Sequence, residues 1–180
     1  MVEEIEVPTE HLHEEMHHRA HGGEGGGFAS QVALASALAA VLAAIAALLA
    51  GANANEAMLD QIRASDKWAY YQAKGIKAAL LSSKMELLTE MGKTPRGKDE
   101  EKIVEYKKQQ EETQKEATEL EKDSHGRFQR HETFARGVTL FQVAIALAAI
   151  SVLTRRRRFF YVSLGFMLFG VGFLIQGFLR

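Results

Sequence analysis

Three long stretches of this chain contain no Asp, Glu, Lys, Arg or His, and they lie at residues 25–55, 137–154 and 159–179. Each is close to the roughly 20 residues that an α-helix needs to cross ~30 Å of hydrocarbon. The second and third stretches are separated only by Arg155, Arg156, Arg157 and Arg158. Two apolar runs joined by a short polar turn are typical of a membrane hairpin. The pattern therefore predicts an all-α protein with three transmembrane helices.

Charged residues are distributed so unevenly that whole-chain averages mislead. The mean hydropathy is -0.14, a value typical of soluble proteins. Residues 1–27 nevertheless hold seven Glu and one Arg, whereas residues 53–136 hold 16 basic and 16 acidic side chains. The chain has no cysteine, which excludes disulfides, thiolate catalysis and cysteine-based metal sites.

Apolar stretches and helix breakers divide the chain into six segments. Glycine and proline occur together between Gly92 and Gly97, which predicts a turn between two long helices. The expected order is an acidic, His-rich tail with a glycine linker at 1–27, a transmembrane helix at 28–52, a charged helical hairpin at 53–136 with its turn at 92–97, a transmembrane helix at 137–154, a basic turn at 155–158 and a transmembrane helix at 159–180.

Both arms of the charged region show helical spacing. In the second arm, residues three or four apart form one row: Ile103, Tyr106, Gln110, Thr113, Ala117, Leu120 and Ser124. In the first arm, apolar residues recur at steps of 4 or 7: Ile62, Ala69, Ile76, Leu80, Leu87 and Met91. These spacings are coiled-coil-like, although much of the seam is polar or small. We therefore expect a long antiparallel hairpin, and each row has two alternative partners, the other arm or another chain.

Two groups of residues are candidates for contacts between copies of the chain. Ala35, Ala39 and Ala43 lie four residues apart on one helical face, and small residues at this spacing let helices approach closely in lipid. Trp68 and Tyr71 share a face of the first arm and are candidates for anchoring a neighbouring subunit or a membrane-protein partner. The alternative for this aromatic pair is packing against the second arm near residues 117–121.

The N-terminal histidines are the only candidate metal ligands. His13, His17 and His21 are spaced by four residues, and His18 lies four residues after Glu14. On a helix this spacing suits weak binding of Zn²⁺ or Ni²⁺. The alternative is a solvated tail whose histidines are incidental, and no other cofactor is expected.

Signals for most activities are lacking. The sequence contains no phosphate loop, GxSxG elbow or HExxH motif, so we expect no enzyme. No acidic or basic residue lies in the interior of a predicted span, which disfavours an ion-coupled transporter. Basic and acidic residues interleave in the hairpin, which argues against nucleic acid as a partner. We expect a non-enzymatic membrane scaffold or interaction protein that self-associates; the alternatives are a small homo-oligomeric channel and a metal-responsive membrane protein.

The arginine turn also predicts orientation. Basic residues in short loops favour the cytoplasmic side of a membrane. This rule places the turn and the N-terminus in the cytoplasm and the hairpin on the opposite side. Arg63 and Arg127 in the hairpin, together with the acidic N-terminal residues, favour the reverse. We give the turn more weight, because the rule weakens in long loops.

Several local motifs resemble a known family. They are Asn55-Glu56-Ala57, the run from Trp68 to Lys74 (WAYYQAK), Arg130-His131-Glu132 and the run from Leu140 to Ala148 (LFQVAIALA). The chain is similar, over nearly its whole length, to a bacterial membrane-protein family catalogued as domain of unknown function 4337. The resemblance implies a bacterial inner-membrane protein with three helices and a charged helical insert, and it implies no reaction, cofactor or binding residue.

Overall fold

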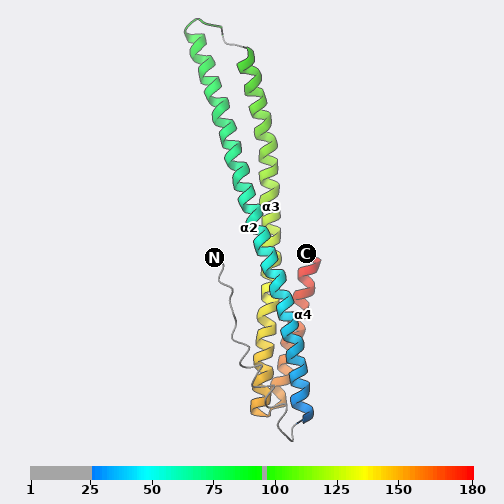
Figure 1. The fold of residues 1–180 in the computed structure, drawn as a ribbon. Helices are drawn as coiled ribbons and strands as arrows, with labels where there is room; N and C mark the ends of the chain where they lie inside the picture. The colour runs from blue at the N-terminus through cyan, green and yellow to red at the C-terminus, as the bar shows by residue number, and fades with distance from the viewer. Residues whose placement is uncertain (1–25, 95–96) are drawn as a thin grey trace. The chain divides into compact units, whose positions relative to one another are not determined.

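A computed structural model describes residues 26–94 and 97–180 of the chain. This part consists of three helices: α2 at Gly26–Glu90, α3 at Gly97–Thr154 and α4 at Arg157–Leu179 (Figure 1). All three are long and apolar enough to cross a membrane. The prediction of an all-α chain with three helices of this kind is confirmed.

The helices end where the sequence supplies breakers. α2 passes without interruption from its uncharged stretch into its charged arm, and it ends at Glu90 just before Gly92, whose φ of 69 suits glycine. α3 carries Asp99 and Glu100 in its first turn, where carboxylates complement the helix dipole. α3 ends at Thr154, and Arg155 follows with a φ of 53, so the turn into α4 is very short.

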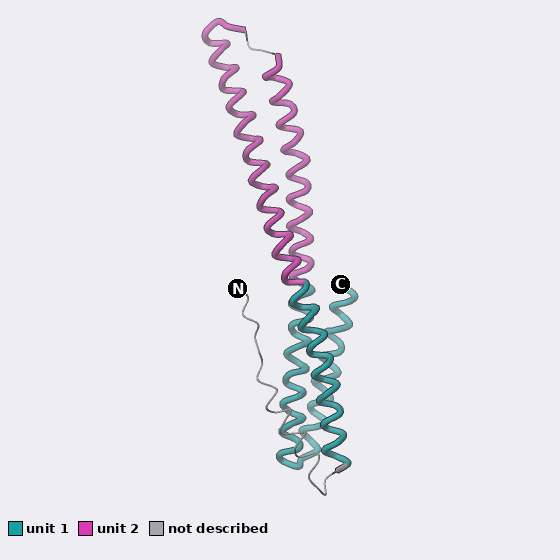
Figure 2. The backbone as a smooth tube through the Cα atoms, viewed as in Figure 1, with its two compact units in different colours: residues 1–52, 130–180 teal, residues 53–129 magenta. Residues whose placement is uncertain are grey.

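The chain forms two compact units, residues 1–52 with 130–180 and residues 53–129 (Figure 2). α2 and α3 each contribute to both units, whereas α4 belongs to the first alone. Each unit has its own contacts and is described separately below.

The first unit has a core built from all three helices. Its buried apolar residues are Ala46, Ala50, Phe134, Phe141 and Leu174. Two glycines of α4 make room for the two rings: a Cβ on Gly170 would lie 2.8 Å from Phe141 Cε1, and one on Gly177 would lie 2.6 Å from Phe134 Cζ. The packing of α3 on α4 therefore depends on an aromatic ring meeting a bare backbone at two points about two helical turns apart.

The second unit is formed by the charged arms of α2 and α3. Their contacts run in opposite directions along the chain: Lys84 pairs with Asp99, the Tyr71 carbonyl accepts a hydrogen bond from Gln110, and the Ala57 carbonyl accepts one from Ser124. As the α2 partner moves toward the N-terminus, the α3 partner moves toward the C-terminus. The two arms of this unit are therefore antiparallel.

Candidate functional site

Small side chains form the α2 side of the seam between the arms. Ala57, Ala64 and Ala78 are buried there, and Ala117 and Ser124 are buried on α3. A Cβ on Gly75 would lie 2.6 Å from Gln110 Nε2, the atom that donates to the Tyr71 carbonyl at 3.1 Å. The two backbones thus approach closely, and side-chain amides and hydroxyls reach across to the neighbouring backbone.

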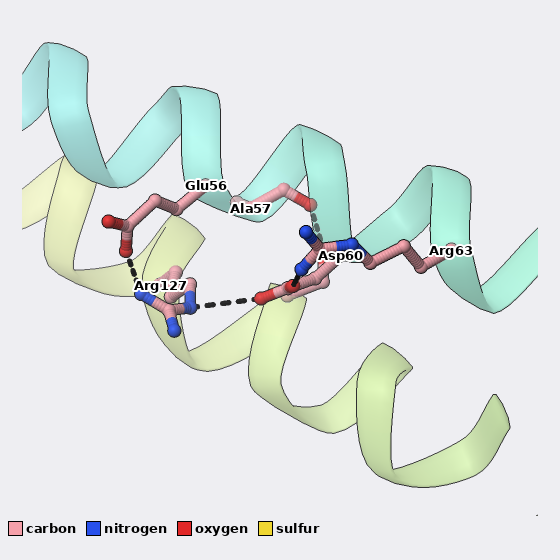
Figure 3. Close-up of polar contacts among 6 residues, drawn as sticks. Glu56, Ala57, Asp60, Arg63 and Arg127 are labelled. Atoms are coloured by element: carbon pink, nitrogen blue, oxygen red, sulfur yellow. Dashed lines mark hydrogen bonds and ion pairs between the residues drawn. The ribbon is translucent and has the colours of Figure 1, made fainter. Parts of the chain in front are cut away.

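A charged cluster lies at one end of this seam (Figure 3). Arg127 of α3 donates from Nε to Asp60 Oδ2 at 2.9 Å and also pairs with Glu56, while Arg63 approaches Asp60 Oδ1 at 3.3 Å. The Asp60 side chain is only 9% exposed, whereas the Arg127 side chain is 39% exposed. A carboxylate that is largely withdrawn from water needs charged partners to be tolerated. Arg127 therefore links α2 to α3 and favours one register of the two helices.

Trp68 and Tyr71 pack within their own chain. Their rings form an edge-to-face pair with centroids 5.5 Å apart. The indole Nε1 of Trp68 donates to Glu121 Oε1 on α3 at 2.8 Å. Both residues are half-buried. These contacts match the alternative of packing on the second arm, and the use of the pair as an anchor for another subunit stays a prediction.

The apolar row of the first arm lies on the side of α2 that faces away from α3. Ile62, Ile76, Leu80, Leu87 and Met91 are all at least half exposed, and Ala69 is exposed as well. With 3.6 residues per turn, this row lies roughly half a turn away from the buried Ala57, Ala64 and Ala78. Alanines and Asp60 form the seam instead, and a hydrophobicity pattern detects large apolar residues more readily than small ones. The row on α3 from Ile103 to Ser124 does face inward, since none of its seven residues is exposed.

The small residues of the first apolar stretch face their own chain to different degrees. Ala39 is 2% exposed, whereas Ala35 and Ala43 are half-buried, and Ala43 packs against the core of the first unit. The neighbouring residues Leu34, Leu38 and Leu48 are exposed. The outer side of this segment therefore carries Leu34, Leu38 and Leu48, whereas Ala39 is turned inward. Contact of Ala35, Ala39 and Ala43 with another copy stays a prediction.

The four arginines surround the turn between α3 and α4. Arg155 and Arg156 form the turn itself, while Arg157 and Arg158 begin α4, and all four are exposed. Arg157 lies 5.4 Å from the ring of Phe28, which packs edge-to-face on Phe160. Cationic and aromatic side chains thus gather at the same end of this unit, an arrangement typical of a membrane–water interface.

The candidate metal ligands His13, His17, His18 and His21 lie outside the described residues. Within residues 26–94 and 97–180 no group of three or more His, Cys, Asp or Glu side chains is placed to hold a metal ion. His131 Nδ1 lies 2.9 Å from the Ala50 carbonyl, so this imidazole bridges α3 and α2 in the first unit.

Comparison with known proteins identifies one family. A family model described as "Domain of unknown function (DUF4337)" matches residues 28–180, which includes all three helices apart from the first residues of α2. No curated protein and no solved structure matches the chain.

Proposed function

The chain belongs to the family described as Domain of unknown function (DUF4337), and we propose that it is a non-enzymatic scaffold of a bacterial inner membrane that self-associates. In this proposal lipid surrounds the three apolar segments, and the charged hairpin stands in water. Exposed leucines on the apolar segment of α2, among them Leu34 and Leu48, support the membrane part.

The observation that carries the scaffold proposal is the two-sided α2 arm. One side holds the seam with α3, and the other exposes large apolar side chains from Ile62 to Leu87. Large apolar side chains that recur along one exposed side of a helix are typical of a surface that a partner covers. The charged groups of the hairpin pair with each other along the arms, which suits a structural rod better than a reaction centre.

The orientation is part of the proposal. The arginine turn is placed in the cytoplasm with the N-terminus, and the hairpin lies on the other side of the membrane. A reporter that fluoresces only in the cytoplasm, inserted at Pro95, should stay dark in cells, and the same reporter inserted in the turn between Arg155 and Arg156 should be bright. The opposite pair of signals would reverse the orientation and leave the scaffold proposal intact.

Self-association is tested by the mass of the full chain in lipid nanodiscs. One chain has a mass of 19.9 kDa. When nanodiscs greatly outnumber protein chains, we expect the protein mass per occupied disc to be two or more times this value. A mass of one chain at all concentrations would remove the proposal. Single-channel recording of the same preparation separates a scaffold from a channel, since a scaffold should give no conductance.

A further inference from the structure

The exposed apolar row of the hairpin follows a heptad pattern. On the α2 arm, positions a would be Leu59, Asp66, Ala73, Leu80 and Leu87, and positions d would be Ile62, Ala69, Ile76 and Ser83. All nine residues are exposed. Seven of them are apolar, and the alternating steps of three and four are those of a helix that packs along another helix. We call these nine residues the outer stripe.

The outer stripe is distinct from the seam with α3. Ile62, Ile76 and Leu80 are 53%, 62% and 65% exposed, whereas Ala64 and Ala78 on the opposite side of the same helix are buried. The α2 arm thus carries two heptad faces, one used within the chain and one open. The open face bears the larger apolar side chains, so the more hydrophobic of the two faces is the one that α3 does not cover.

The area of the outer stripe suits a specific interface. Its five Leu and Ile side chains, with Met58 and Met91 at the edges, each expose half to two-thirds of their surface. At on the order of 100 Å² each, these seven residues present roughly 700 Å² per copy, close to the ~800 Å² that each partner buries in a stable interface. A partner that covers the stripe must itself be long, straight and apolar along one face.

A further copy of the same α2 arm meets these requirements. Copies in one bilayer share the same sidedness, so their identical helices leave it in the same direction. Parallel, in-register packing would place Ile62, Ile76 and Leu80 against the same residues of the neighbour. In this register large residues meet large ones, and Ala69 and Ala73 each meet the same small residue of the neighbour. We propose that the outer stripe forms a parallel, in-register homo-oligomeric coiled coil between α2 arms. This inference rests on the proposed self-association.

The residues at the a and d positions also indicate the number of copies. Leucine at a and isoleucine at d favour three or four strands over two. The outer stripe has Leu59, Leu80 and Leu87 at a and Ile62 and Ile76 at d. Ala69, Ala73 and Ser83 contribute little at their levels, and Asp66 opposes the packing because its like charges would gather at one level of the interface. The assembly is therefore a trimer or tetramer that is weakened at the level of Asp66.

Single cysteines test the register directly, because the natural chain has none. The variants are Ile62→Cys, Ile76→Cys and Leu87→Cys, each made in the full chain, reconstituted in liposomes and oxidised with copper phenanthroline. Parallel in-register packing brings identical a or d positions within disulfide range. We expect all three variants to yield a disulfide-linked dimer band. Two control variants carry the cysteine at other exposed positions, Ala79→Cys on the flank of α2 and Val104→Cys on α3. Each should yield at least tenfold less disulfide-linked dimer.

The outcomes separate this inference from the proposed function. Crosslinking at Ile76 without crosslinking at positions 62 and 87 indicates antiparallel arms and overturns the proposed register. Equal crosslinking at stripe and control positions indicates random collision and overturns the interface. A multimeric wild-type chain whose stripe cysteines do not crosslink refutes the inference while self-association stands. A monomeric wild-type chain removes both.

Discussion

Replacing Gly170 with alanine should destabilise the first unit, although alanine is the better helix former. The added Cβ would lie 2.8 Å from Cε1 and 3.0 Å from Cδ1 of Phe141. Phe141 is 0% exposed and belongs to the core with Phe134 and Leu174, so its ring cannot rotate away without displacing other core residues. A backbone shift or a strained rotamer must then absorb the overlap.

Gly172 supplies the matched control on the same helix. A Cβ at this position would meet nothing within 4 Å. Alanine there should gain up to ~1 kcal/mol from helix propensity. Gly170→Ala should gain the same amount but lose about 1–3 kcal/mol through overpacking. The difference between the two variants is therefore about 2 kcal/mol, with Gly170→Ala the less stable.

Thermal unfolding of both variants in the same mild detergent measures this difference. At roughly 2–4 °C per kcal/mol for a chain of this size, the two midpoints should differ by about 4–8 °C. The midpoint is the temperature at which half of the protein still elutes as the monodisperse peak in size-exclusion chromatography after heating. Equal midpoints for the two variants would show that Phe141 does not press on α4 at Gly170, and the packing of α3 on α4 would need revision.

Three further predictions concern the hairpin and the tail. Arg127→Met should lower the free energy of unfolding by about 1–2 kcal/mol, because Asp60 loses its closest partner but keeps Arg63 and some contact with solvent. The control Arg136→Met, which removes an exposed pair with Glu132, should lower it by no more than ~0.5 kcal/mol. Equal losses for the two variants in chemical unfolding would refute the role of Arg127. Exchanging leucine and isoleucine in the outer stripe (Leu59→Ile, Ile62→Leu, Ile76→Leu and Leu80→Ile) should shift the assembly toward dimers at unchanged composition, and an unchanged mass in nanodiscs would speak against the stripe as the interface. A peptide of residues 9–22 should bind Zn²⁺ weakly through His13, His17, His18 and His21, whereas the absence of heat with micromolar zinc in calorimetry would end the metal-responsive alternative.

Helix bounds were largely predictable from sequence, because they depend on local properties. The uncharged stretches, the glycines around residue 92 and the arginine turn mark the ends of α2, α3 and α4 to within a few residues. The inward row of α3 was also predictable, since Ala117 and Ser124 repeat at a coiled-coil spacing. Each of these features is visible within one or two helical turns of the chain.

The partners of the helix faces were not predictable in the same way. The spacing of the row containing Ile62 and Leu80 was compatible with contact to α3 or to another chain. The face buried against α3 is made of alanines, whose small size lets the arms approach closely. The pairing of Arg127 with Asp60 joins residues far apart in sequence, and many other oppositely charged pairs were equally available. The fit of Phe141 against Gly170 depends on side-chain volume across two helices, which single-helix periodicity does not contain.

Extraction of cell membranes with alkaline carbonate tests the central claim, that lipid surrounds three segments of this chain. The account predicts that the full-length protein stays in the membrane pellet and is released only by detergent. Recovery of the protein in the carbonate supernatant, monodisperse without detergent, would contradict it.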